Sequence, residues 1–230
     1  MKTMLCIHLI PIITEKIMGL EITSGMLAEF KGSEPEAYET YKKIFQNINV
    51  VLAANNLEPH NEPEEMENEA LQFGGFPYSF LHHLRRFLAH VWENEGDENW
   101  KPKPFSPNED PGVDSILEDH YSYMESHLLT HSDAEGFYLP VKMPEVLFDI
   151  EEARVPGAMI GSSYSLLEEL KGLTKHLGIE LDDNNDIMNI QQLNEIIQKN
   201  GDFWIEILVC ASLIDAAKFS INNHTAILFN

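Results

Sequence analysis

Positive charge is scarce in this sequence. Lysine and arginine together number 15, against 38 aspartates and glutamates, which gives a formal net charge of −23. Proteins that bind nucleic acid or anionic membranes directly use a basic surface, and this composition does not supply one. The composition therefore predicts no nucleic acid and no membrane as partners. A basic protein is the partner that such a surface would attract, although a merely solvated acidic surface explains the same charge.

Cysteine is also scarce, because the chain contains only Cys6 and Cys210. Two cysteines make no disulfide framework, so we expect the reducing cytoplasm as the compartment. Cys210 lies in an apolar run, which favours a small core residue over a reactive thiol.

Nucleophile elbows, dinucleotide fingerprints, kinase signatures and paired-cysteine metal motifs are all lacking. Two stretches come near a motif. Residues 182–186 resemble the start of a calcium loop, but Ile187 and Leu193 stand where glycine and glutamate are needed. Residues 157–163 could hold an anion on backbone N–H groups with help from Arg154, but no lysine follows the second glycine. Helix caps and turns explain both stretches better.

The clearest structural signal is the apolar run from Phe203 to Phe219, followed by a strand-like segment that ends at Phe229. Glu206 and Asp215 lie nine positions apart, so on one helix they point to opposite faces. A helix without a coherent polar side is covered on most sides. We therefore predict a buried helix in which at least one of these two carboxylates has low exposure.

The remaining pattern predicts the α+β class. We expect a small mixed or antiparallel sheet, made of a hairpin near residues 126–141 and the C-terminal strand, packed with several amphipathic helices around the buried C-terminal helix. Residues 1–230 are expected to form a single globular domain, with a proline-rich loop at 93–112. The glutamate-rich stretch from Glu58 to Glu69, which has no lysine or arginine, is interpreted as a solvated loop.

Three interpretations of the N-terminus stay open. Residues 1–17 could form a signal peptide, an ordinary first strand, or an extension upstream of Met18. The apolar run from Met4 to Ile13 is too short to span a bilayer.

The candidate metal or ligand site lies in the predicted hairpin. His127 and His131 share one face of a strand there, Asp133 and Glu135 follow in the turn, and His120 lies upstream. Imidazole and carboxylate are ligands for zinc or iron, and His131 with Asp133 is the most local metal pair. On a straight strand the two histidines would be roughly 13 Å apart, so a shared metal needs a bend.

Arg85 and Arg86 form a second candidate ligand site, because they lie with three histidines in the only basic spot of the chain. They could bind an anionic ligand or pair with carboxylates of the protein itself.

Two functions follow from these observations. The first is a non-catalytic, cytoplasmic protein-binding module with an immunity- or antitoxin-like role and a basic protein partner. The alternative is a metal-dependent hydrolase that uses the histidine and aspartate cluster around residues 120–135. No cofactor is specified by the sequence.

Overall fold

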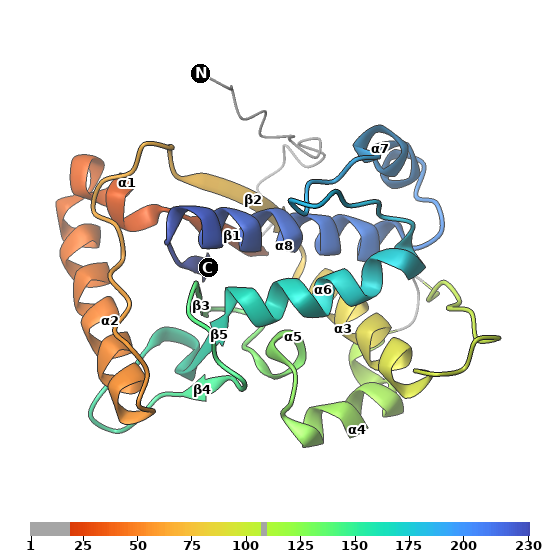
Figure 1. Ribbon diagram of the computed structural model, residues 1–230, viewed down its shortest axis with the longest axis horizontal. Helices are drawn as coiled ribbons and strands as arrows, with labels where there is room; N and C mark the ends of the chain where they lie inside the picture. The colour runs from red at the N-terminus through yellow and green to blue at the C-terminus, as the bar shows by residue number, and fades with distance from the viewer. Residues whose placement is uncertain (1–18, 107–109) are drawn as a thin grey trace.

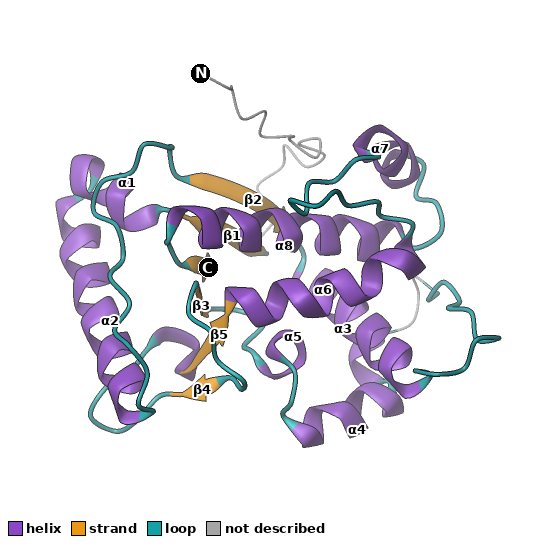
Figure 2. Cartoon of the chain, in the orientation of Figure 1, coloured by secondary structure: helices purple, strands orange, loops and turns teal. Residues whose placement is uncertain are grey.

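A six-stranded mixed sheet organises the fold (Figure 1, Figure 2). The computed structural model describes residues 19–106 and 110–230. Within them the strands are ordered β2-β1-β6-β3-β5-β4. The β3–β5 pair is parallel and the other four pairs are antiparallel. The strands are β1 (Leu20–Ser24), β2 (Leu71–Phe76), β3 (Gly136–Leu139), β4 (Leu147–Phe148), β5 (Met159–Ser162) and β6 (Ile227–Phe229).

Eight α-helices of the described residues surround this sheet. They are α1 (Met26–Ser33), α2 (Pro35–Ala54), α3 (Tyr78–Glu93), α4 (Ser115–Tyr123), α5 (His127–Thr130), α6 (Ser163–Leu177), α7 (Ile190–Gln198) and α8 (Trp204–Asn223). Short 3₁₀ turns add Pro111–Val113 and Pro156–Ala158. The predicted α+β class is confirmed.

The sheet separates two hydrophobic cores, because side chains alternate between its faces. Tyr138, Ile227 and Phe229 point into the larger core with α3, α6 and α8. Phe137 and Leu228 point into the smaller core, which is closed by α2. Figure 1 shows α2 at one end of the molecule, with α8 and α6 side by side away from it. The molecule is therefore layered as α2, sheet, and the remaining long helices.

Helix α8 is the buried centre that the apolar run predicts. Most of its residues are buried, and it packs against α3, α6 and α7. Glu206 is only 5% exposed, and its Oε1 lies 3.8 Å from His83 Nδ1. The prediction of a poorly exposed carboxylate on this helix is confirmed. The following strand, β6, occupies the middle of the sheet.

The predicted hairpin is wrong. His127–Thr130 is the short helix α5, and β3 pairs with β5 and β6 instead of with residues 126–130. The cause is a helix start at Ser126, whose Oγ accepts hydrogen bonds from the amides of Leu128 and Leu129. Serine also caps α6, where Ser162 Oγ accepts a hydrogen bond from the Ser165 amide.

The proline-rich segment predicted at 93–112 contains no strand and, after Glu93, only the start of the 3₁₀ turn at Pro111 within its described part. The alternatives for residues 1–17 lie outside the described residues. Among the helices of the described part, none combines the length and hydropathy required to cross a membrane.

Candidate functional site

Carboxylates gather at the end of the molecule formed by α1, the start of α2 and the loop that follows α2. Figure 1 shows this loop running back beside α2 toward α1 (left side of the view). We call this region the acidic end. Its members are Glu29, Glu34, Glu36, Glu39, Glu64, Glu65, Glu67 and Glu69; all are exposed except Glu64, which is partly covered.

The local sequence explains why the helical carboxylates are held outward. Pro35 starts α2, with Glu34 in the position before it. Glu36 and Glu39 are three positions apart on α2, so their Cβ atoms are neighbours at about 5–6 Å. The opposite side of the helix is apolar and packs on the sheet through residues such as Ile48. The helix thus buries one face and presents glutamates on the other.

Two lysines join the loop to the helices of the acidic end. Lys31 Nζ lies 3.3 Å from Glu64 Oε2 and 3.0 Å from Glu65 Oε1. Lys42 Nζ lies 3.3 Å from Glu64 Oε1. Hydrogen bonding from Tyr38, then from Lys42 and Lys31, lowers the pKa of Glu64. These contacts fix the loop locally, and the glutamates still greatly outnumber the lysines.

A second group of exposed carboxylates lies where α3 and α4 pack together. Lys101 and Lys103 lie in the chain between the members near the end of α3 and those in and after α4, so this part of the sequence is less uniformly acidic than the acidic end. Its members are Glu93, Glu95, Asp97, Glu98, Glu118, Asp119 and Glu125.

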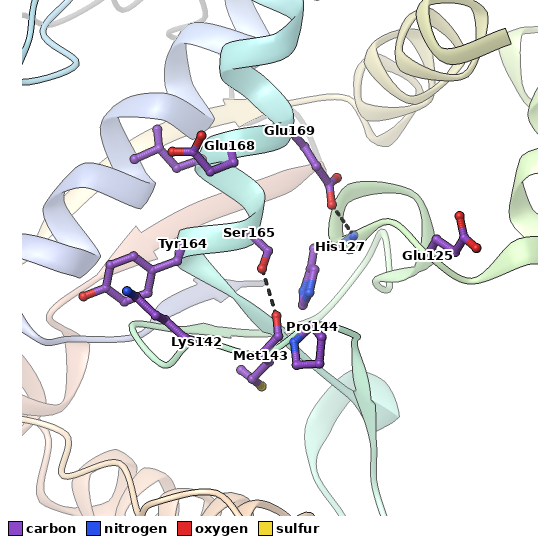
Figure 3. Close-up of a pocket in the computed structure, with 10 residues that line it drawn as sticks. Glu125, His127, Lys142, Met143, Pro144, Tyr164, Ser165, Glu168 and Glu169 are labelled. Atoms are coloured by element: carbon purple, nitrogen blue, oxygen red, sulfur yellow. Dashed lines mark hydrogen bonds between the residues drawn. The ribbon is translucent and has the colours of Figure 1, made fainter. Parts of the chain in front are cut away.

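A groove of about 630 Å³ lies between α6 and the segment after β3 (Figure 3). Lys142, Met143, Tyr164 and Glu168 are among its lining residues, and Lys142 Nζ stands 5.5 Å from the centre of the Tyr164 ring. This volume would accommodate a small molecule. The ionisable groups at its inner wall, however, are already engaged in holding the fold.

Those inner groups are Glu169 and His127. Glu169 accepts hydrogen bonds from Ser126 Oγ and from the amides of His127 and Leu128, so it anchors the start of α5. Burial raises the pKa of Glu169, while these hydrogen bonds oppose the rise. His127 Nδ1 accepts from the Ser162 amide at 3.0 Å, and burial lowers the pKa of the ring. Both side chains therefore act as structural links between α5 and α6.

The two histidines predicted to share a site do not converge on one. His127 lies on α5, whereas His131 follows that helix and is 2% exposed. His131 Nδ1 lies 2.9 Å from the Ser132 carbonyl oxygen, its Nε2 lies 3.1 Å from the Phe137 carbonyl oxygen, and its ring stacks on Tyr138 at 4.1 Å. Burial lowers the pKa of His131 to about 4, so the ring is neutral at pH 7. A neutral imidazole has one N–H, so one nitrogen of His131 donates to a main-chain carbonyl, while the other lies within 3.1 Å of a second carbonyl oxygen.

Of the other predicted site residues, Arg85 contacts His131, but at its main-chain carbonyl and not at its ring. Asp133 Oδ2 lies 3.1 Å from His82 Nε2, and Glu135 is exposed. Arg85 is buried and donates to the carbonyls of Leu128 and His131. Arg86 Nε donates to Asp114 Oδ2 at 2.8 Å. Across residues 19–106 and 110–230, no group of three or more histidine, cysteine, aspartate or glutamate side chains could hold a metal ion. Ligand binding at these side chains stays a prediction.

The comparisons with known proteins give one positive result. Residues 18–229 match the model of a family described as "Putative DNA-mimic protein", and since the match spans nearly the whole chain, this protein belongs to that family. No curated protein and no solved structure matches.

The family match corrects the function expected from the sequence. An immunity- or antitoxin-like module without any relation to nucleic acid is wrong, and the metal-dependent hydrolase has no support. The partner prediction is wrong to leave nucleic acid out of account, and the reason is physical. Acidic charge disfavours direct binding to DNA, but it is the property that a protein needs to imitate DNA. The glutamate-rich stretch 58–69 is a loop in the structure, and most of its glutamates are exposed, in line with its interpretation as a solvated loop.

Proposed function

We propose that this protein is a DNA mimic whose acidic end occupies the DNA-binding surface of a DNA-binding protein. The observation that carries the proposal is the family match over residues 18–229, joined to a region where exposed glutamates gather on α1, α2 and the following loop. The partner is thus defined by its ability to bind DNA, and nucleic acid enters as the competitor.

The physical basis is charge substitution. Duplex DNA carries one negative charge per about 1.7 Å of its axis, and basic side chains that neutralise phosphates supply much of the affinity of DNA-binding proteins. Glutamates one helical turn apart place carboxylates about 5–6 Å from each other. Carboxylates with ordinary pKa values near 4 are ionised at pH 7, as phosphates are. The basic surface of the partner can therefore neutralise glutamates in place of phosphates.

Glutamates can imitate the charge of the DNA backbone but not the identity of the bases. Phosphate contacts position a protein on DNA, whereas contacts to base edges specify the sequence. Glutamate side chains supply the charge of the backbone without the donor and acceptor pattern of the bases. We therefore expect partners whose affinity comes mainly from backbone contacts. A reducing compartment that contains DNA is the expected location, and the buried free Cys210 is compatible with it.

A DNA-displacement assay tests the proposal. Labelled DNA is bound to a purified helix-turn-helix repressor, to an HU-type nucleoid protein or to a single-strand-binding protein, and the acidic protein is titrated in. We expect it to release the DNA from at least one of them. Release from none of the three would refute the proposal.

Two variants that lose the same number of negative charges at different places test whether the position of the charge or only the net charge matters. In the first, four members of the acidic end are neutralised: Glu34→Gln, Glu36→Gln, Glu39→Gln and Glu67→Gln. The control neutralises four exposed glutamates elsewhere: Glu151→Gln, Glu152→Gln, Glu168→Gln and Glu195→Gln. We expect only the first variant to lose displacement. Equal losses in both would show that net charge, and not the acidic end, is recognised.

A further inference from the structure

The loop of the acidic end is anchored by one buried carboxylate, although most of the other carboxylates in this loop are exposed. We call residues 58–69 the acidic loop. Within it the side chain of Glu62 is 1% exposed, whereas Glu58, Glu65 and Glu67 are exposed. A buried carboxylate is costly unless hydrogen bonds compensate for its lost hydration. The hydrogen bonds around Glu62 therefore have to be identified.

Three donors surround Glu62. Its Oε2 is 2.6 Å from His60 Nε2 and accepts from the Ala226 amide at 2.8 Å, while its Oε1 accepts from Thr225 Oγ1. Thr225 and Ala226 directly precede β6, which lies between β1 and β3 in the sheet. Glu62 thus ties the middle of the acidic loop to the centre of the fold.

Asn49 of α2 provides a second tie. Its Nδ2 donates to the His60 carbonyl at 2.9 Å, and its Oδ1 accepts from the His60 amide at 2.8 Å. The His60 ring also packs near Phe45, with 6.0 Å between ring centres. One asparagine therefore satisfies both main-chain groups of His60, and the loop is fixed to the helix as well as to the sheet.

These hydrogen bonds restrain a loop that its acidic composition would otherwise make extended and mobile. A segment rich in like charges repels itself and extends, so its carboxylates would occupy many positions. Binding to a mobile segment is weakened by the loss of conformational entropy when the segment becomes ordered, whereas a preorganised surface loses little entropy. We propose that Glu62 is a positioning residue: it contacts no partner, and it holds the acidic loop in the fixed shape that a protein with a rigid DNA-binding surface recognises. This inference rests on the proposed function.

A pair of variants with identical charge tests the inference. Asn49→Asp adds one negative charge and places a carboxylate oxygen against the His60 carbonyl, which removes a tie. Asn61→Asp adds the same charge to the same loop at an exposed side chain outside the network. If attraction alone matters, both variants bind at least as tightly as the original protein. If position matters, Asn49→Asp displaces DNA about tenfold less well, because the loop has to be ordered on binding.

Glu62→Gln supplies the direct test, because its amide retains the size of the side chain but cannot accept all three hydrogen bonds. We expect a loss of displacement similar to that of Asn49→Asp. Hydrogen exchange of the amides of residues 58–69 is measured in parallel, and exchange in α8 reports whether the core stays folded. Faster exchange confined to the acidic loop, with weaker displacement, supports the inference.

The outcomes separate the two proposals. If the original protein displaces DNA and both Asn49→Asp and Glu62→Gln do so equally well, the positioning role is overturned while the proposed function stands. Unchanged exchange of the acidic loop in Asn49→Asp and Glu62→Gln overturns the positioning role whatever the binding result. If the original protein displaces no DNA, the proposed function fails, and hydrogen exchange alone decides whether Glu62 holds the loop.

Discussion

Replacing Asp215 with asparagine should stabilise the protein at neutral pH. Asp215 lies on α8, and burial raises its pKa from the ordinary 3.8 to about 6, with Lys218 opposing the rise and Asp186 adding to it. Lys218 is itself paired with Asp186, so its charge is shared. Ionised Asp215 is therefore less stable in the folded protein than in the unfolded chain.

The sign and size follow from proton linkage. Between pH 4 and pH 6 the folded state binds more protons at Asp215 than the unfolded state does, so its contribution to stability falls as pH rises. The difference between 3.8 and about 6 corresponds to about 3 kcal/mol at pH 7. Asparagine resembles the protonated acid and cannot ionise. The gain should be about 3 kcal/mol at pH 7 and a few tenths at pH 4.

Urea denaturation at pH 4 and pH 7 measures this difference, and thermal melting should show an increase of roughly 6–12 °C at pH 7. Asp183→Asn, at an exposed aspartate, is the control and should change stability by less than about 0.5 kcal/mol. An equal effect of Asp215→Asn at the two pH values would refute the linkage argument. Destabilisation at pH 7 would show that the ionised form makes a favourable contact.

Three further predictions concern charge, metal and backbone. Affinity for the displaced DNA-binding protein should fall as salt rises, and a salt-independent affinity would contradict recognition by charge. Chelator treatment should leave the melting temperature unchanged, because both nitrogens of the buried His131 ring face main-chain carbonyl oxygens; a rise of several degrees on adding zinc would contradict this. Gly157→Ala should destabilise by more than about 1 kcal/mol in urea denaturation, because φ is +72° and the added Cβ would lie 2.2 Å from the Glu135 carbonyl oxygen. Unchanged stability would show that the turn relaxes.

Sequence patterns predict the parts of this fold that depend on local periodicity. The apolar run of α8 identifies a buried helix because no polar stripe interrupts it, and the apolar positions of α2 recur at the three- and four-residue steps of an amphipathic helix. Helix α5 is different. Its start is capped by Ser126 and is also held by Glu169, which lies 42 residues beyond His127 in the chain. The alternating residues near position 127 favour a strand, because the contact with the distant carboxylate cannot be located from the sequence.

The same distinction applies to the candidate site. The density of glutamate in residues 58–69 is visible in the sequence, and it predicts exposure for most of them. Glu62 is indistinguishable there from its neighbours, because its burial depends on Thr225, 163 residues away. Net charge alone does not identify a DNA mimic, because the same acidic composition fits a solvated surface. The family match supplied what the residue pattern could not.

Competition at equilibrium tests the central claim most directly. The apparent dissociation constant of a responsive DNA-binding protein for its DNA is measured at increasing concentrations of the acidic protein, with the salt concentration held fixed. If this protein occupies the DNA-binding surface, the apparent constant rises linearly with its concentration without reaching a limit. A rise that levels off, with a ternary complex of DNA and both proteins, would place the contact elsewhere and contradict mimicry of DNA.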